Sequence, residues 1–445
     1  MGLSGLEIYK LLPKTNCKEC GFPTCLAFAM QIAAKKIALD KCPYVSAEAK
    51  VKLESASRPP INLVTVGTGE AKLQIGNETV MFRHEETFYH PTGIGFLVED
   101  TLSESDLDKK LDAIEKLKFE RVGQKINPDL VAVAGSSKKK DNFVKAAKKA
   151  SEKTSLNLVL ISEDAALLRA ALEATKDKKP LLYAANKDNF DAVVSLAREF
   201  SVPVAIRASS LDELSELAQK AASSGISEAV LDPGSPSLRK RIEDLTYIRR
   251  MALKKSFRPF GYPTISFTQS ADPFEEAGEA ASLIAKYSGI VIVKSVESFL
   301  VMPLLTVRQN IYTDPQKPLQ VEPNVYEIGS VTKDSPILVT TNFSLTYYTV
   351  ESEVEASKVP SYIISIDSEG MSVLTAWAAD KFTPEKIAAA LKQYSMGDRV
   401  NKKELVIPGY VAVMSGKLED ESGWKVNVGP REASAIPSYL KNARR

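Results

Sequence analysis

Short apolar runs alternate with longer, charge-rich amphipathic stretches between residues 93 and 311. A short apolar run bounded by polar turns is typical of a buried strand, so eight of these runs predict strands. The predicted strands cover residues 94–98, 130–134, 158–161, 181–184, 203–206, 229–231, 264–267 and 290–293. Stretches such as 106–119 and 211–222 predict the helices between them. Eight strand–helix units in about 220 residues are what a (β/α)8 TIM barrel requires.

We place this barrel in residues 61–311 and expect a hairpin at its amino-terminal end. Residues 61–66 read as one strand, and residues 72–75 and 79–83 read as two strands joined around Gly76-Asn77. Glycine and asparagine tolerate the left-handed backbone that tight hairpin turns need, which is why this pair predicts the turn.

The loops that follow the strands of such barrels carry the working residues. Here they contain residues 100, 162–163, 186, 232–234 and 268–269, among them Asp100, Asn186 and Asp232. These loops show no cluster of histidine, cysteine and carboxylate side chains that would indicate a catalytic site. Because a fold alone does not imply a reaction, we predict that the barrel serves as a scaffold.

A polar, proline-rich stretch at residues 312–324 predicts an extended linker, and a second α/β pattern follows it in residues 325–445. Predicted strands cover 337–340, 362–366, 405–407 with 411–413, and 425–428, and predicted helices cover 344–357, 371–379, 384–394 and 431–440. Mostly parallel strands joined by helices predict a doubly wound sheet. Such sheets bind ligands at the carboxyl ends of their strands.

The carboxyl ends of these predicted strands are rich in small and hydroxyl-bearing residues and poor in charge. They cover residues 340–346, 367–372, 414–416 and 429–433. This composition suits a broad, flat ligand with peripheral amides, held by backbone amides and hydroxyls. The alternative is a set of ordinary turns with helix caps, such as Thr383 before Pro384. The pattern alone leaves both interpretations open.

All four cysteines, Cys17, Cys20, Cys25 and Cys42, lie in one short stretch with the spacing C-x2-C-x4-C-x16-C. Disulfides mark small secreted domains, whereas this chain is long and shows no secretion signal. Structural zinc usually uses two C-x2-C hairpins, and this stretch has only one. A [4Fe-4S] cluster takes thiolates from an irregular loop and one remote cysteine, often followed by proline as in Cys42-Pro43. We therefore favour a [4Fe-4S] domain in residues 1–58.

The sequence around the third cysteine supports this interpretation. Gly21 and Pro23 keep the loop irregular, and residues 26–38 predict a helix that begins beside Cys25. The positive end of a helix dipole stabilises a thiolate in its first turn. A preceding helix over residues 6–12 would cover one side of the site.

Composition narrows the range of partners and compartments. The 58 basic residues balance 56 acidic ones, which gives no support for binding to nucleic acid or to a membrane surface. The chain contains no run of 18 apolar residues that could span a bilayer, and its first residues lack the pattern of a signal peptide. We therefore expect a cytoplasmic protein.

Taken together, three motifs and their order resemble a known family. The motifs are Thr-Asn-Cys-Lys-Glu-Cys-Gly-Phe-Pro-Thr-Cys at 15–25, Thr-Thr-Asn-Phe-Ser-Leu-Thr at 340–346 and Ser-Glu-Gly-Met-Ser at 368–372. With the barrel between them, the chain closely resembles the large (gamma) subunit of the corrinoid iron-sulfur protein of the anaerobic acetyl-CoA (Wood–Ljungdahl) pathway. The resemblance covers essentially the whole chain.

This resemblance implies a methyl carrier that acts within methyltransferase reactions. In that family the corrinoid cobalt, as Co(I), accepts a methyl group from methyltetrahydrofolate on a separate methyltransferase and passes it to acetyl-CoA synthase. The cluster reduces Co(II) back to Co(I). The implied partners are the small subunit, which completes a heterodimer, the methyltransferase, acetyl-CoA synthase and a reductive activator.

The resemblance also assigns site residues. Cys17, Cys20, Cys25 and Cys42 would ligate the cluster. The residues that would contact the corrinoid are Thr340, Thr346, Gly370, Met371, Ser372, Val373, Gly429 and Ile436. Many corrinoid modules offer cobalt a histidine from an Asp-x-His-x-x-Gly motif, but this chain has no histidine after His90. We therefore expect a base-off, histidine-off corrinoid, with Thr346 near its lower face.

Two rival functions stay open on the sequence. One is an electron-transfer module that carries an iron–sulfur cluster and no corrinoid. The other is a barrel methyltransferase that binds folate itself, for which Asp232 and Asn186 would be the candidate pterin ligands.

Overall fold

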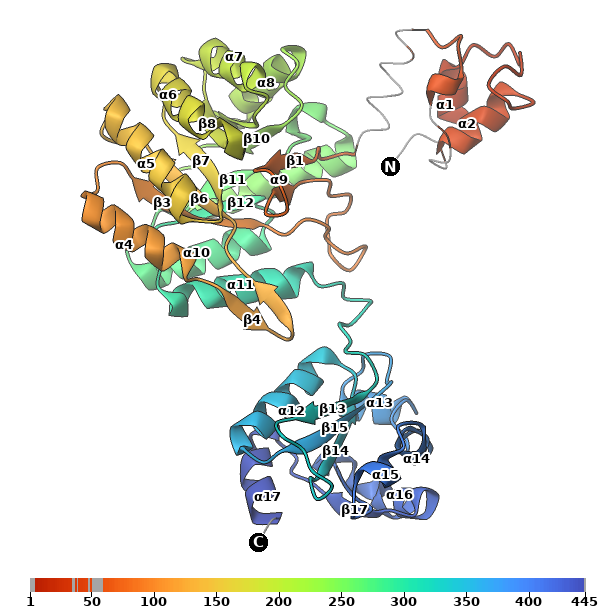
Figure 1. The fold of residues 1–445 in the computed structure, drawn as a ribbon. Coiled ribbons are helices and arrows are strands. Elements are labelled where there is room, and N and C mark those ends of the chain that lie inside the picture. The colour runs from red at the N-terminus through yellow and green to blue at the C-terminus, as the bar shows by residue number, and fades with distance from the viewer. Residues whose placement is uncertain (1–4, 34–36, 38, 47–48, 50–58, 444–445) are drawn as a thin grey trace. The chain divides into compact units, whose positions relative to one another are not determined.

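The structure is a computed structural model that describes residues 5–33, 37, 39–46, 49 and 59–443. The chain forms two compact units (Figure 1). Unit 1 comprises Met1–Lys118 and Asn127–Tyr312, and unit 2 comprises Phe119–Ile126 and Thr313–Arg445. The predicted end of the amino-terminal domain, at residue 58, lies outside the described residues. Within the described ranges, no helix is both long and apolar enough to cross a bilayer.

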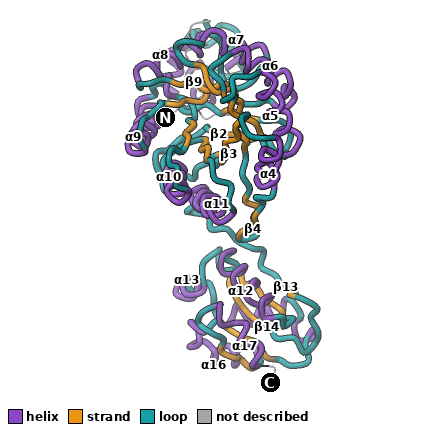
Figure 2. The backbone as a smooth tube through the Cα atoms, turned by 90° about the vertical axis from the view of Figure 1, so that its left-hand side faces the viewer, coloured by secondary structure: helices purple, strands orange, loops and turns teal. Residues whose placement is uncertain are grey.

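Eight parallel strands of unit 1 form the predicted barrel, and Figure 2 shows them enclosed by helices. The strands are β3 (Gly93–Glu99), β6 (Leu130–Ala134), β7 (Asn157–Ile161), β8 (Leu181–Ala185), β9 (Val204–Arg207), β10 (Ala229–Asp232), β11 (Ile265–Phe267) and β12 (Ile290–Val293). They pair in the order β10-β9-β8-β7-β6-β3-β12-β11. A single parallel bridge between Leu231 and Thr264 brings β10 to β11 and nearly closes the ring.

One helix follows each barrel strand. These helices are α4 (Glu104–Glu115), α5 (Lys140–Lys153), α6 (Ala165–Thr175), α7 (Phe190–Glu199), α8 (Leu211–Ser223), α9 (Leu238–Lys255), α10 (Pro273–Ala285) and α11 (Ser298–Tyr312). Alternate strand residues face the interior, as Leu130 and Ala132 do on β6, while Val131 and Val133 face the helices. Both faces of each strand are therefore buried, which explains the continuous apolar runs in the sequence.

The predicted hairpin at residues 72–83 is wrong in its pairing. β2 (Leu73–Ile75) pairs antiparallel with β1 (Val64–Val66), and residues 79–83 form no strand. Gly76 does turn the chain, with φ of +91°. After the turn, however, the Val80 carbonyl accepts a hydrogen bond of 2.6 Å from the buried Arg249 side chain, so it is not available to a strand ladder.

Unit 2 contains a five-stranded sheet with helices on both faces. Its strands are β13 (Val325–Ile328), β14 (Ile337–Thr341), β15 (Ser361–Ile366), β16 (Glu404–Ile407) and β17 (Lys425–Val428), in the order β13-β15-β14-β16-β17. All neighbours are parallel except the edge strand β13, which the sequence pattern did not predict. This is the strand arrangement of a doubly wound domain. The binding of a corrinoid by it stays a prediction.

The helices of unit 2 form two layers. They are α12 (Ser344–Ser357), α13 (Val373–Ala378), α14 (Pro384–Gln393), α15 (Met396–Arg399), α16 (Ser415–Ser422) and α17 (Ile436–Ala443). α12 and α17 pack on one face of the sheet, and α13 to α16 pack on the other. The predicted helix at 431–440 begins only at Ile436, where Pro437 suits the first turn of a helix.

Unit 2 also includes a hairpin from within the barrel segment of the chain. β4 (Phe119–Arg121) and β5 (Gln124–Ile126) pair antiparallel between α4 and β6 in sequence. The predicted linker is ordered near its end as well, because Gln320 forms an antiparallel bridge with Phe343. Residues 319–321 therefore belong to the edge of the unit 2 fold.

Candidate cofactor sites

Three of the four cysteines belong to or border a small apolar core near the amino terminus. α1 (Gly5–Leu11) and α2 (Cys25–Ala33) pack through Ile8 and Phe28, and Cys20, Cys25 and Cys42 border the same core. Cys25 is buried, and Cys17 is exposed. The predicted helix over 26–38 begins at Cys25 and is described as far as Ala33, because residues 34–36 and 38 lie outside the described residues.

The loop before α2 has the irregular backbone that the sequence predicts. Residues Lys14, Asn16, Lys18 and Gly21 all have positive φ, between 49° and 84°. The Asn16 N–H donates to Cys25 Sγ at 3.4 Å, and the Cys25 N–H donates to Asn16 Oδ1 at 2.8 Å. Hydrogen bonds from backbone amides to cysteine sulfur are a feature of iron–sulfur sites, where they tune the potential. The donor set and the loop therefore fit such a cluster.

Tyr44, two residues after the fourth cysteine, is hydrogen-bonded to the loop between Cys17 and Cys20. The hydroxyl of Tyr44 donates to Glu19 at 2.8 Å, and this hydrogen bond raises the pKa of Tyr44. Over the described part of the chain, no three His, Cys, Asp or Glu side chains gather closely enough to hold a metal ion. Ligation of a cluster by the four thiols thus stays a prediction.

A second candidate site lies where the strand order of unit 2 reverses. β14 pairs with β15 on one side and with β16 on the other, so the chain winds outward from β14 in both directions. Parallel sheets bind ligands at the carboxyl ends of the strands at this position. β14 pairs with β16 at Leu338 and Val406, and the next residues along both strands line a cavity of about 250 Å³.

Five of the eight predicted corrinoid residues line this cavity. They are Thr340 on β14, Thr346 on α12, Val373 on α13, Gly429 after β17 and Ile436 on α17. Tyr410 and Arg431, which lie outside the predicted set, line it too. The Tyr410 hydroxyl donates to Glu432 at 2.7 Å, and this hydrogen bond raises the pKa of Tyr410. The wall is thus mainly apolar, with hydroxyls and one guanidinium.

Thr340 carries the observation that points most directly to a ligand. Its side chain is 1% exposed, and its hydroxyl finds no hydrogen-bond partner among the described residues. A buried hydroxyl without a partner is unfavourable by about 1–3 kcal/mol, and such groups are rare in native proteins. A ligand with amide or other polar groups would satisfy it, and the peripheral amides of a corrinoid are groups of this kind.

The other three predicted residues, Gly370, Met371 and Ser372, lie on the loop after β15 and do not line the cavity. Asn342, buried after β14, holds this loop. Its Oδ1 accepts hydrogen bonds from the Ser368 N–H at 2.9 Å and from the Gly370 N–H at 3.1 Å. Asn342 therefore joins the two sequence motifs, a role that the predicted site did not include.

Gly429 shows how tightly the cavity wall is packed. A β-carbon there would lie 2.8 Å from Val406 Cγ1 and 3.0 Å from the carbonyl oxygen of Ile407. We expect Gly429→Ala to lower the free energy of unfolding by about 1–3 kcal/mol, because β16 must move to make room. Gly416→Ala on α16 is the matched control, since its β-carbon would meet nothing within 4 Å. Urea unfolding followed by circular dichroism would measure both, and equal stability of the two variants would contradict this packing.

The mouth of the barrel also contains a cavity, of about 540 Å³, lined by residues that follow β6 to β9. Tyr183 donates to Asp232 at 2.5 Å, and burial together with the Asp232 charge raises the pKa of Tyr183. The other Asp232 oxygen accepts from the Gly234 N–H at 2.9 Å. Asn186 Oδ1 accepts two backbone N–H groups of its own turn, at 2.9 and 3.1 Å. The candidate pterin acceptors are therefore already engaged.

Comparison with known families matches almost the whole chain. Residues 63–440 match the family described as "CO dehydrogenase/acetyl-CoA synthase delta subunit", and residues 12–44, which contain all four cysteines, match "Putative Fe-S cluster". The corrinoid/iron-sulfur protein large subunit of Moorella thermoacetica is 47% identical, with 99% of each chain covered.

Two archaeal relatives are similar over the same length. The acetyl-CoA decarbonylase/synthase complex subunit gamma of Methanothermobacter thermautotrophicus is 37% identical, with 99% of each chain covered. The subunit of the same name from Archaeoglobus fulgidus is 36% identical, with 98% of each chain covered. The resemblance read from the sequence motifs is thus confirmed, and the chain belongs to the CO dehydrogenase/acetyl-CoA synthase delta subunit family, alongside the large subunits of corrinoid/iron-sulfur proteins.

Proposed function

We propose that this chain is a methyl carrier of the acetyl-CoA pathway, with a corrinoid in the unit 2 cavity and a [4Fe-4S] cluster on Cys17, Cys20, Cys25 and Cys42. The observation that carries the proposal is the buried hydroxyl of Thr340, which has no hydrogen-bond partner among the described residues and lies in a cavity lined by five residues of the predicted corrinoid site. Full-length similarity to a protein named for both cofactors supports it.

The residues of the cavity indicate how it would hold a corrinoid. Thr340 would donate to a peripheral amide, and the apolar side chains of Val373 and Ile436 would pack against the flat ring system. When bound, the corrinoid would supply a cobalt centre that accepts a methyl group and gives it up again. The lining contains no histidine, and Thr346 on α12 is the residue that we place near the lower face. The chain would thus leave cobalt without a nitrogen ligand of its own, which eases its reduction.

The cysteine domain would return oxidised cobalt to its active state. Protein [4Fe-4S] clusters reach potentials down to about −700 mV, low enough for this task. The methyl donor would be methyltetrahydrofolate on a separate methyltransferase, and the acceptor would be acetyl-CoA synthase. A small subunit and a reductive activator complete the proposed set of partners. The rival in which this chain binds folate itself would use Asp232 and Asn186, both of which already accept hydrogen bonds within the protein.

Metal analysis of the anaerobically purified native protein tests the proposal. We expect about one cobalt and four iron atoms per chain, with a corrinoid spectrum beside the cluster absorbance. The electron paramagnetic resonance signal of the Co(II) form should lack splitting from an axial nitrogen. Iron without cobalt, even after addition of the small subunit and a cobamide, would favour the electron-transfer module. Splitting from an axial nitrogen would contradict the histidine-off and base-off state, but it would leave the methyl-carrier proposal itself intact.

A further inference from the structure

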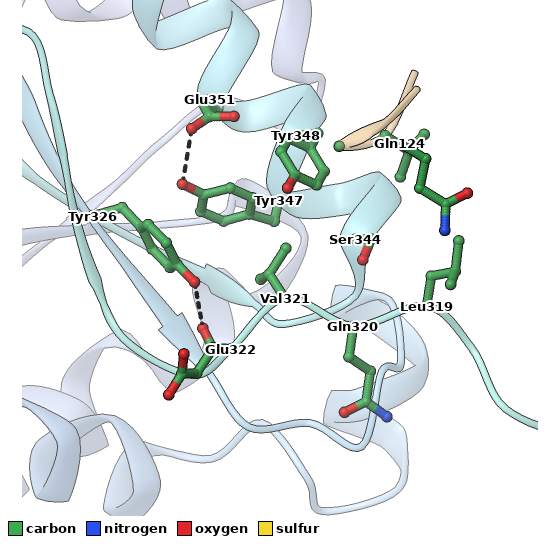
Figure 3. A pocket seen from close by; sticks show the side chains of 12 residues that line it. Gln124, Leu319, Gln320, Val321, Glu322, Tyr326, Ser344, Tyr347, Tyr348 and Glu351 are labelled. Atoms are coloured by element: carbon green, nitrogen blue, oxygen red, sulfur yellow. Dashed lines mark hydrogen bonds between the residues drawn. The ribbon is translucent and has the colours of Figure 1, made fainter. Parts of the chain in front are cut away.

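Helix α12 separates two cavities of unit 2. Leu345, Thr346 and Thr349 line the candidate corrinoid cavity on one flank of the helix. On the other flank, Tyr347 and Tyr348 line a second cavity of about 350 Å³, shown in Figure 3. Its remaining walls come from the β4–β5 hairpin, from residues 319–322 and from β13. Any shift of α12 therefore changes both cavities at once.

The tip of the β4–β5 hairpin contacts α12 directly. A β-carbon at Gly123 would lie 2.6 Å from Tyr348 Cε2 and closer still to the Tyr348 hydroxyl, so an alanine there would force the Tyr348 ring to move. Figure 3 shows the end of the hairpin beside Tyr348. Tyr348 in turn packs against the apolar core that α12 shares with α17. The hairpin thus presses on the helix from the flank opposite the candidate corrinoid cavity.

The turn of the hairpin that makes this contact has an unfavourable backbone conformation. Its two turn residues, Val122 and Gly123, have φ of +53° and +66°, as a two-residue turn between antiparallel strands requires. A β-branched residue such as Val122 rarely adopts positive φ, and strained residues of this kind persist where the surroundings fix them. A turn that served only to join two short strands would not need a valine at this position.

Residues 319–321 hold the first turn of α12 from a second direction. The Ser344 N–H, at the start of the helix, donates to the Leu319 carbonyl at 2.9 Å, and the Val321 N–H donates to the Asn342 carbonyl at 2.9 Å. The backbone just before α12 is therefore pinned, while the hairpin acts one turn further along, at Tyr348. Thr346 lies between these two points of support.

We propose that Gly123 and its hairpin are positioning elements that set the place of α12, and with it the Thr346 wall of the candidate corrinoid cavity. The expected effect on a bound corrinoid rests on the proposed function, whereas the positioning of α12 by the hairpin does not. Gly123 does not line the candidate corrinoid cavity itself, and the three atoms nearest to its β-carbon position all belong to Tyr348. Loss of the contact should loosen α12 and change the environment of a bound corrinoid.

Hydrogen–deuterium exchange of the full chain without corrinoid tests the hold on α12. In Gly123→Ala we expect the amides of residues 347–351 to exchange about tenfold faster than in the unmodified protein. Gly423→Ala is the matched control, since Gly423 has φ of +67° but its β-carbon would meet nothing within 4 Å. This control should leave α12 unchanged. Equal protection of α12 in both variants would overturn the proposal.

Two further variants keep the test decisive if Gly123→Ala folds poorly. Tyr348→Leu removes the contacted ring atoms without backbone strain, and it should also speed exchange in α12. In the double variant Gly123→Ala/Tyr348→Leu, the added alanine should have little further effect, because the two residues act on the same contact. Additive effects would show that Gly123 acts elsewhere and would contradict the proposed route.

The cobalt-loaded complex with its small subunit gives the second readout. Gly123→Ala should shift the visible spectrum of bound corrinoid and the Co(II)/Co(I) midpoint potential, while Gly423→Ala should shift neither. If the unmodified protein binds no cobalt, the proposed function fails, and the exchange data still decide the role of the hairpin. If cobalt binds and exchange changes, but spectrum and potential stay the same, the link from α12 to the cofactor is refuted.

Discussion

Cys17→Ala should remove most of the iron from the protein and leave its cobalt in place. A cubane needs four ligands, and loss of one thiolate leaves an open iron site from which clusters degrade. Cys17 is exposed, so its removal leaves the Ile8–Phe28 core intact. The candidate corrinoid cavity, by contrast, is built from unit 2 residues alone. Iron, acid-labile sulfide and cobalt per chain, measured after anaerobic purification, test this expectation.

Lys18→Ala is the control for the cysteine variant. Lys18 lies in the same loop and also has positive φ, but the change keeps all four thiols. We expect it to retain full iron content. Retention of iron in Cys17→Ala would contradict ligation by that residue. Loss of iron and cobalt together would show instead that corrinoid binding depends on the cluster domain.

The barrel could be predicted from sequence because its strands are buried on both faces. A run such as Leu130–Ala134 is apolar at every position, and its pattern needs no knowledge of partners. The β4–β5 hairpin gave no such signal, since Phe119–Arg121 and Gln124–Ile126 are short and largely polar. Its turn also has valine where glycine or asparagine would mark a hairpin. Its place in unit 2 depends on a contact with Tyr348, far away in sequence.

The apolar run at 411–413 shows how a sequence pattern can mislead. The run predicts a strand, but residues Gly409–Met414 form 3-10 turns interrupted by a kink at Val411, with φ of −112° and ψ of 25°. Val411 and Met414 are buried, whereas Tyr410 and Val413 are exposed, at 45% and 77%. The two buried side chains are thus three positions apart, whereas a strand with one buried face would bury every second residue. In so short a segment, the apolar residues of the sequence fit a repeat of three residues as well as a repeat of two.

The candidate sites likewise have features that the sequence could predict and features that only the folded chain shows. The motif at 340–346 contains two residues of the cavity wall, Thr340 and Thr346, whereas Gly370, Met371 and Ser372 of the motif at 368–372 do not line the cavity. Motif resemblance could not show that Asn342 ties the loop after β15 to the end of β14, since that link depends on a buried amide. Nor could it show which hydroxyls lack partners, because that property exists only in the folded chain.

Thr340→Val should have opposite effects on the protein with and without its ligand. Valine keeps the shape of threonine but removes the hydroxyl that has no partner in the described structure. Without ligand, we expect the free energy of unfolding to rise by about 1 kcal/mol, because an unpaired buried group is gone. With a corrinoid present, the hydrogen bond to the ligand is lost, and we expect about tenfold weaker cobalt retention.

Thr341→Val makes this comparison specific. The Thr341 hydroxyl is also buried and without a partner among the described residues, but neighbouring strand residues face opposite sides of a sheet, and Thr341 does not line the cavity. It should therefore stabilise the ligand-free protein to a similar extent and leave cobalt retention unchanged. Urea unfolding and cobalt retained after dialysis separate the two effects. If both variants retained cobalt equally well, the Thr340 hydroxyl would have no contact with the corrinoid, and the cavity would lose its strongest claim to that ligand.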